Sequence, residues 1–110
     1  AVHYRIPMLV VVANNQSFYN DEVHQERVAI TRSRPVENKW IGQRIADPDI
    51  DFARLAEAQG AQGIGPVRTT GELARALEKG IAAVRAGNVV VIDARVDPGY
   101  DPATAKSLQK

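Results

Sequence analysis

The 110-residue sequence contains no cysteine, few aromatic residues and no long apolar run. The absence of cysteine excludes disulfide bonds and thiolate metal sites, and it fits a reducing, cytoplasmic setting, which we expect here. Aromatic residues make up only 5% of the chain, so a core must be built from aliphatic side chains. No stretch approaches the ~20 apolar residues of a membrane helix, and no signal-peptide pattern is present. We therefore expect no membrane partner.

A strong charge of one sign is also lacking, because 14 basic residues nearly balance 13 acidic ones and the net charge is +1. This balance gives no electrostatic reason to expect a nucleic acid, and we expect none. The length leaves room for one domain, and an apolar content of 45% is ordinary for a globular chain.

The most informative stretch is an apolar run at residues 8–13 that stops at Asn14, Asn15, Gln16 and Ser17. An apolar run without polar alternation predicts a parallel strand that is buried on both faces. Ligands of open α/β sheets bind at the carboxyl ends of such strands. Amide and backbone oxygens are hard donors of the kind that Mg²⁺ takes. A plain turn is the alternative, because asparagine readily closes loops.

The following segment predicts a helix over residues 21–31, with Asn20 as its N-cap. From Arg27 to Arg44 the chain carries five basic residues and the single acid Glu37. This basic stretch suits either an anionic partner or an ordinary solvated loop. A lone histidine, His24, is interpreted as a surface residue, and Trp40 as a residue at a domain contact.

The second half of the sequence predicts alternating helices and strands. Asp51 is the expected N-cap of a helix over residues 52–59, whose buried face would comprise Phe52, Leu55 and Ala56. Thr69 and Glu72 form an S/T-x-x-E capping box before a helix over residues 70–86. Residues 62–65 and 89–94 are predicted strands, so that the fold class is α/β with a parallel sheet between helical layers.

Two further features near these strands indicate structural roles. The glycines of Gly63-Ile64-Gly65 are not a dinucleotide fingerprint, because Pro66 follows where a helix should open, and they indicate a close approach of backbones. Asp93 lies at the carboxyl end of the last strand, and we interpret it as a tether for loops.

Three segments carry a resemblance to thiamin-diphosphate-dependent enzymes. A strand ending in Asn14-Asn15 and followed by an aromatic residue resembles the second half of the cofactor motif of this family. Residues 51–60 are similar to its Asp-Phe-x-x-Leu-Ala-x-x-x-Gly segment, and residues 89–93 to its last core strand. The similarity is closest to the acetolactate synthase and benzoylformate decarboxylase group. The Gly-Asp-Gly half of the motif, which contains the metal-anchoring aspartate of the family, does not occur in this sequence.

The resemblance implies cofactors, site residues and partners. Thiamin diphosphate and Mg²⁺ are the implied cofactors, with Asn15 giving its side-chain oxygen and Ser17 its backbone carbonyl to the metal. The implied cofactor-binding residues are Asn14, Asn15, Gln16, Ser17 and Phe18. Phe18 and its neighbour Tyr19 would either wall the pocket or pack. We assign no catalytic residue to this chain, because its histidines and serines form no nucleophile–base pair.

The same resemblance implies a role within a longer enzyme. We expect residues 1–96 to be the C-terminal part of a diphosphate-binding domain of a 2-oxo acid decarboxylase or carboligase, and residues 97–110 to be a tail. The chain would pack against the rest of that enzyme, a companion chain or copies of itself, and it would be inactive alone. A non-catalytic α/β module that binds an anion through the stretch from Arg27 to Arg44 is the alternative.

Overall fold

The computed structural model describes residues 1–97 and 99, which fall into two compact units. The first unit comprises Ala1–Asn14 and Ile50–Val96, and the second is described over Asn15–Asp49. The predicted tail, residues 97–110, lies outside the described residues except for Asp97 and Gly99.

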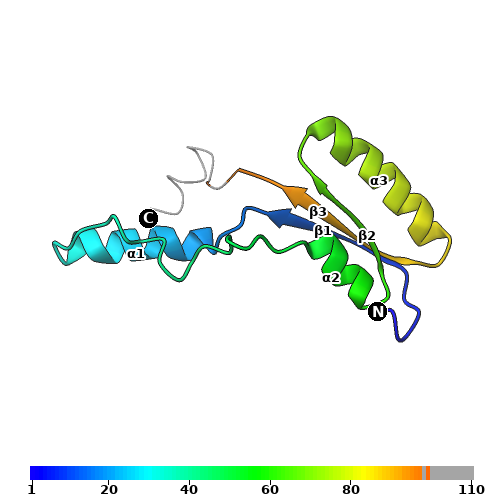
Figure 1. Ribbon diagram of the computed structural model, residues 1–110, viewed down its shortest axis with the longest axis horizontal. Coiled ribbons are helices and arrows are strands. Elements are labelled where there is room, and N and C mark those ends of the chain that lie inside the picture. The colour runs from blue at the N-terminus through cyan, green and yellow to red at the C-terminus, as the bar shows by residue number, and fades with distance from the viewer. Residues whose placement is uncertain (98, 100–110) are drawn as a thin grey trace. The chain divides into compact units, whose positions relative to one another are not determined.

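The first unit contains a three-stranded parallel sheet (Figure 1). The strands are β1 (Met8–Asn14), β2 (Gln62–Val67) and β3 (Val89–Arg95), and their order in the sheet is β1-β3-β2. β3 pairs in parallel with both neighbours, so the predicted α/β fold with a parallel sheet is confirmed. The register of the β2–β3 pair shifts between Ile64 and Val67, where Pro66 has no N–H to donate to the ladder.

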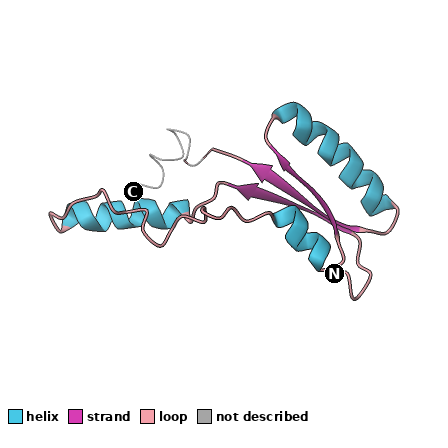
Figure 2. Ribbon diagram, viewed as in Figure 1, coloured by secondary structure: helices cyan, strands magenta, loops and turns pink. Residues whose placement is uncertain are grey.

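Two helices cover opposite faces of this sheet, α2 (Phe52–Ala58) and α3 (Thr70–Arg85) (Figure 2). Gly80 of α3 lies against Leu9 and Val90, which are paired across β1 and β3 and so point to one face. On the other face, Gly63 of β2 approaches the backbone of α2 at Ala53. The arrangement is therefore the expected three-layer sandwich.

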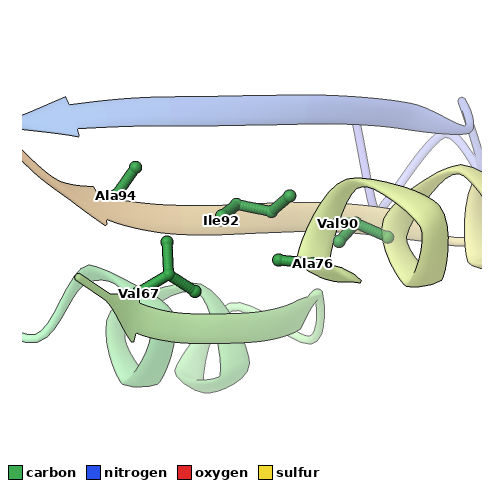
Figure 3. Close-up of a cluster of buried hydrophobic side chains, with 5 residues drawn as sticks. All are labelled: Val67, Ala76, Val90, Ile92 and Ala94. Carbon is green, nitrogen blue, oxygen red and sulfur yellow. The ribbon is translucent and has the colours of Figure 1, made fainter. Parts of the chain in front are cut away.

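The core lies between β3 and α3. Ile92 and Val90 of the central strand are fully buried. The side chains that form this cluster are small or aliphatic, as the scarcity of aromatic residues predicts (Figure 3): Val67, Ala76, Val90, Ile92 and Ala94.

The helix starts that were predicted for this unit are confirmed. Asp51 is the N-cap of α2, where its carboxylate accepts the N–H of Arg54 at 2.9 Å. Thr69 and Glu72 form the expected capping box at the start of α3. These local signals work because both partners lie within four residues of each other.

The predicted buried face of α2 is wrong in part. Ala56 is buried as expected and Phe52 is half-buried, but Leu55 is exposed and Ala53 is buried in its place. The helix packs so closely on Gly63 that only small side chains fit in the contact.

The prediction that the first strand is buried on both faces is also wrong. β1 lies at the edge of the sheet, and its residues Met8, Val10 and Val11 are exposed. The continuous apolar pattern instead belongs to an edge strand whose faces α2 and α3 leave largely uncovered. The central strand β3 has the burial that was expected for β1.

The second unit contains α1 (Tyr19–Thr31) and the irregular segments on either side of it. The predicted N-cap Asn20 is wrong, because the helix begins earlier, after Phe18. Phe18 caps it through its backbone carbonyl, which accepts from Asp21 at 2.9 Å and from Glu22 at 3.2 Å. No side chain supplies the cap here, and Asn20, although a residue type that favours the N-cap, lies inside the first turn of the helix.

Candidate functional site

Asn14, the first asparagine of the motif, belongs to the first unit. Its side chain is buried, and its Nδ2 donates to Oδ1 of Asp93 at 2.9 Å. Its backbone carbonyl accepts the N–H of Val96 at 3.2 Å. These contacts fix the carboxyl end of β1 to the carboxyl end of β3.

Asp93 is the most deeply placed charged group of the first unit, with no exposed surface. Besides Asn14, its carboxylate accepts the backbone N–H of Phe52 at 3.4 Å, at the start of α2. Asp93 thus joins three elements, in agreement with its interpretation as a tether.

The other four predicted site residues, Asn15, Gln16, Ser17 and Phe18, lie in the second unit, in the loop that leads into α1. Oδ1 of Asn15 accepts the backbone N–H of Ser17 at 3.1 Å. This contact forms an Asx turn, which fits the plain turn given as the alternative, and it also fixes the direction of the side-chain oxygen. A carbonyl oxygen has a second lone pair, which this turn leaves available.

Gln16 occupies the left-handed region, with φ at 57°. Its Nε2 donates to the carboxylate of Asp49, and its backbone carbonyl accepts from Ile45 N at 2.8 Å. The side-chain amide and the backbone carbonyl of Gln16 are therefore both held by residues that follow α1. Phe18 is 57% exposed, and its predicted part in a pocket wall stays a prediction.

An antiparallel bridge pairs Ser17 with Arg44. The hydrogen bonds of this bridge run between the neighbouring residues, with Phe18 N donating to Gln43 O at 2.9 Å and Ile45 N to Gln16 O. In such a pair the groups of the central residue point away from the partner segment. Within the part of the chain that the structure describes, no hydrogen bond reaches the carbonyl oxygen of Ser17.

Glu22 is a buried acid that sequence reasoning did not single out. It is 4% exposed, and it accepts a hydrogen bond from the hydroxyl of Ser17. Nε of Arg44 lies 4.0 Å from the same carboxylate oxygen, and the guanidinium of Arg44 lies over the ring of Trp40, 5.5 Å from its centroid. In the sequence Glu22 is only an acid in the first turn of a helix, so no local pattern indicated this contact.

The basic stretch from Arg27 to Arg44 is partly neutralised within the second unit. Lys39 pairs with Glu26 at 2.8 Å, and the hydrogen bond that its ammonium donates to this carboxylate raises the pKa of Lys39 above its ordinary value. Two other basic residues of the stretch, Arg32 and Arg34, border an open cavity of about 360 Å³. The other residues that line it are His24, Gln25, Val28, Ala29 and Pro35.

Over residues 1–97 and 99, no three acidic or histidine side chains gather as metal ligands. The donors that the motif offers there are neutral oxygens. They are the side-chain oxygen of Asn15 and the backbone carbonyl of Ser17, which are two residues apart and belong to one turn.

Comparison with family models decides the identity of the fold. The model described as "Thiamine pyrophosphate enzyme, C-terminal TPP binding domain" matches residues 1–94. The chain belongs to this family. Its part in a thiamin-diphosphate-dependent enzyme is therefore the binding of thiamin diphosphate, and the resemblance seen in the sequence is confirmed at this level.

The other two comparisons found no match, either among the curated proteins or among the solved structures. In the described part of the chain, no helix is both long and apolar enough to cross a membrane.

Proposed function

We propose that this chain binds the Mg²⁺–diphosphate end of thiamin diphosphate in a 2-oxo acid decarboxylase or carboligase of the acetolactate synthase and benzoylformate decarboxylase type. The family match supports thiamin diphosphate as the cofactor. The geometry of the loop at Asn15 and Ser17 is the observation that carries the metal assignment. In this proposal residues 1–96 form the C-terminal part of the diphosphate-binding domain.

Asn15 and Ser17 are suited to a small, hard cation. Mg²⁺ takes oxygen ligands in near-ideal octahedral geometry, usually together with waters and phosphate oxygens. The turn fixes Oδ1 of Asn15, and the bridge turns the carbonyl of Ser17 away from Gln43–Ile45. The side-chain oxygen of Asn15 and the backbone carbonyl of Ser17 would hold the metal, which would supply positive charge to bind the diphosphate.

The mechanism assigns binding and orientation to this chain. When bound, the cofactor supplies the electron sink for bond cleavage or formation next to a 2-oxo group. Asn15 and Ser17 hold the metal end, while Asn14 and Asp93 fix the end of the strand that precedes them. No residue of this chain is proposed to transfer a proton.

The substitution Asn15→Ala tests the metal assignment in the enzyme that carries this chain. Loss of one oxygen ligand should weaken Mg²⁺ binding in the presence of thiamin diphosphate by about tenfold or more, because outer-shell losses alone reach this size. Isothermal titration with Mg²⁺ measures the effect. Asn38→Ala is the matched control, since Asn38 is exposed in the same unit and outside the loop. Equal Mg²⁺ affinity in both variants would refute the assignment.

A second candidate function rests on the cavity that Arg32 and Arg34 line together with apolar residues such as Val28 and Ala29. In this alternative the chain is a non-catalytic module that binds an anion there. Titration with inorganic diphosphate in the absence of metal separates the two functions. Binding that Arg32→Gln removes and Asn15→Ala preserves would favour the module.

A further inference from the structure

Glu22 is a buried carboxylate whose two contacts join the segments on either side of α1. Its side chain is 5% exposed, and burial of a charge is costly unless hydrogen bonds or an opposite charge compensate it. The hydroxyl of Ser17 supplies the hydrogen bond, and Arg44 supplies the opposite charge. Ser17 and Arg44 are also the two residues that face each other in the antiparallel bridge.

The contact between Ser17 and Glu22 restrains the loop at a residue whose own backbone groups make no bond in the bridge. The bridge holds Gln16 and Phe18 to Gln43 and Ile45, but it leaves the peptide groups of Ser17 pointing outward. The hydroxyl of Ser17 donates a hydrogen bond to Glu22. This bond limits how far Ser17 can rotate between the two backbone hydrogen bonds of the bridge. The direction of the Ser17 carbonyl therefore depends on Glu22.

We infer that Glu22 is a positioning residue for the metal site, acting through the Ser17 hydroxyl to aim the Ser17 carbonyl. The inference rests on the proposed function of Asn15 and Ser17. We assign Glu22 no role as a metal ligand, because Oε1 accepts the hydrogen bond from the Ser17 hydroxyl and lies 4.0 Å from Nε of Arg44.

The capping role of an acid in the first helical turn is a competing explanation for Glu22. Asp21 occupies the same turn and is exposed, so dipole stabilisation alone requires no burial. A test must therefore measure metal geometry as well as the stability of the helix.

The ratio of Mg²⁺ affinity to Ca²⁺ affinity reports on the geometry of the metal site. It is measured in the enzyme that carries this chain, with thiamin diphosphate bound. Mg²⁺ demands near-ideal octahedral geometry, whereas Ca²⁺ accepts irregular shells. Glu22→Ala should therefore lower Mg²⁺ affinity by about tenfold, as losses of outer-shell partners do, and lower Ca²⁺ affinity less. Glu22→Gln keeps an acceptor for the hydroxyl and should recover part of the Mg²⁺ affinity.

The matched control is Glu26→Ala, which removes an acid of the same helix whose carboxylate pairs with Lys39. It should leave the Mg²⁺ to Ca²⁺ ratio unchanged. Ser17→Ala keeps the backbone carbonyl but removes the hydroxyl, and it should lower the ratio as Glu22→Ala does. In the double variant the two losses should not add, because both break the same contact.

A readout without metal completes the test. In the cofactor-free enzyme, Glu22→Ala and Ser17→Ala should both speed hydrogen exchange at the amides of Phe18 and Ile45, and Glu26→Ala should not. If Asn15→Ala weakens Mg²⁺ binding but Glu22→Ala and Ser17→Ala leave the ratio unchanged, the role of Glu22 is refuted and the metal site stands. If Asn15→Ala has no effect on Mg²⁺ binding, the metal site itself is refuted, and this inference with it.

Discussion

At the scale of the residue, Glu72 gives a stability contribution whose pH dependence can be stated in advance. Its carboxylate accepts the backbone N–H of Arg68 at 2.7 Å and that of Thr69 at 3.2 Å. The bond from Arg68, followed by that from Thr69, holds the pKa of Glu72 below its ordinary value of 4.5. A carboxyl whose pKa is lowered on folding stabilises the folded state above its unfolded pKa and stops doing so as pH falls through the folded value.

Glu72→Ala should therefore lower the thermal unfolding midpoint at neutral pH, and the difference from the unaltered protein should shrink below pH 4.5. Circular dichroism of both proteins over a pH series measures this. Glu78→Ala is the control, because Glu78 is exposed on the same helix and takes no part in the capping box. A difference that is constant across the series would contradict the assigned cause.

The site residues show which contacts a sequence can reveal. The pair Thr69 and Glu72 was predicted because both partners lie within one helical turn. Asn14 and Asn15 were recognised as a motif, but their different surroundings were not, since Asn14 contacts Asp93, 79 residues away. The bridge between Ser17 and Arg44 likewise has no periodic or capping signal, and so Glu22 remained unnoticed.

At the scale of the element, Gly63 controls how closely α2 packs on β2. A Cβ at this position would lie 2.2 Å from the backbone carbonyl oxygen of Ala53, and a backbone atom cannot move aside as a flexible side chain can. Gly63→Ala should therefore destabilise the fold by about 1–3 kcal/mol through overpacking. Urea unfolding measures the loss.

The control for this prediction is Gly71→Ala in the first turn of α3. A Cβ there meets no atom closer than Nη1 of Arg75 at 3.7 Å. Replacing an unstrained glycine should be neutral or stabilise by roughly 0.5–1 kcal/mol, since alanine has less freedom to lose on folding. Equal destabilisation by both substitutions would show that the loss of glycine, and not the contact with Ala53, is responsible.

The elements themselves were predicted more reliably than their burial. Continuous apolar runs identified β1 and β3 as parallel strands, but such runs do not say which strand is central. Burial is decided by neighbours, and the order β1-β3-β2 gives β3 a strand on each side while β1 has one. The burial of Ala53 in α2 was likewise not predicted, because the spacing of apolar residues along a helix does not indicate how closely the helix packs on the sheet.

At the scale of the whole molecule, family membership extends over residues 1–94 and so includes residues of both units. Cofactor class follows from this membership. The 2-oxo acid substrate and the choice between decarboxylation and carboligation belong to the proposal, in which Asn15 and Ser17 would hold the metal end of the cofactor and not its reacting end.

The exposed strand β1 leads to a prediction about association. Met8, Val10 and Val11 are each about two-fifths exposed, and within the described residues β1 pairs with β3 alone. Full burial of such a side chain is worth roughly 1.5–3 kcal/mol, so covering the two-fifths that remain exposed would add about 0.6–1.2 kcal/mol for each residue. An unpaired apolar edge is also a template for another chain. The chain purified alone should therefore associate, in line with the expectation from the sequence that it packs against the rest of an enzyme, a companion chain or copies of itself.

Sedimentation over a concentration series checks this prediction, and lysine substitutions locate the surface. Val10→Lys combined with Val11→Lys should shift the chain toward the monomer, because charges on an edge strand oppose pairing with another strand. Ile30→Lys is the matched control, since Ile30 is 64% exposed but lies on α1. If the unaltered chain sediments as a monomer at every concentration, or if Ile30→Lys dissociates it as well as the β1 substitutions do, β1 is not the associating surface.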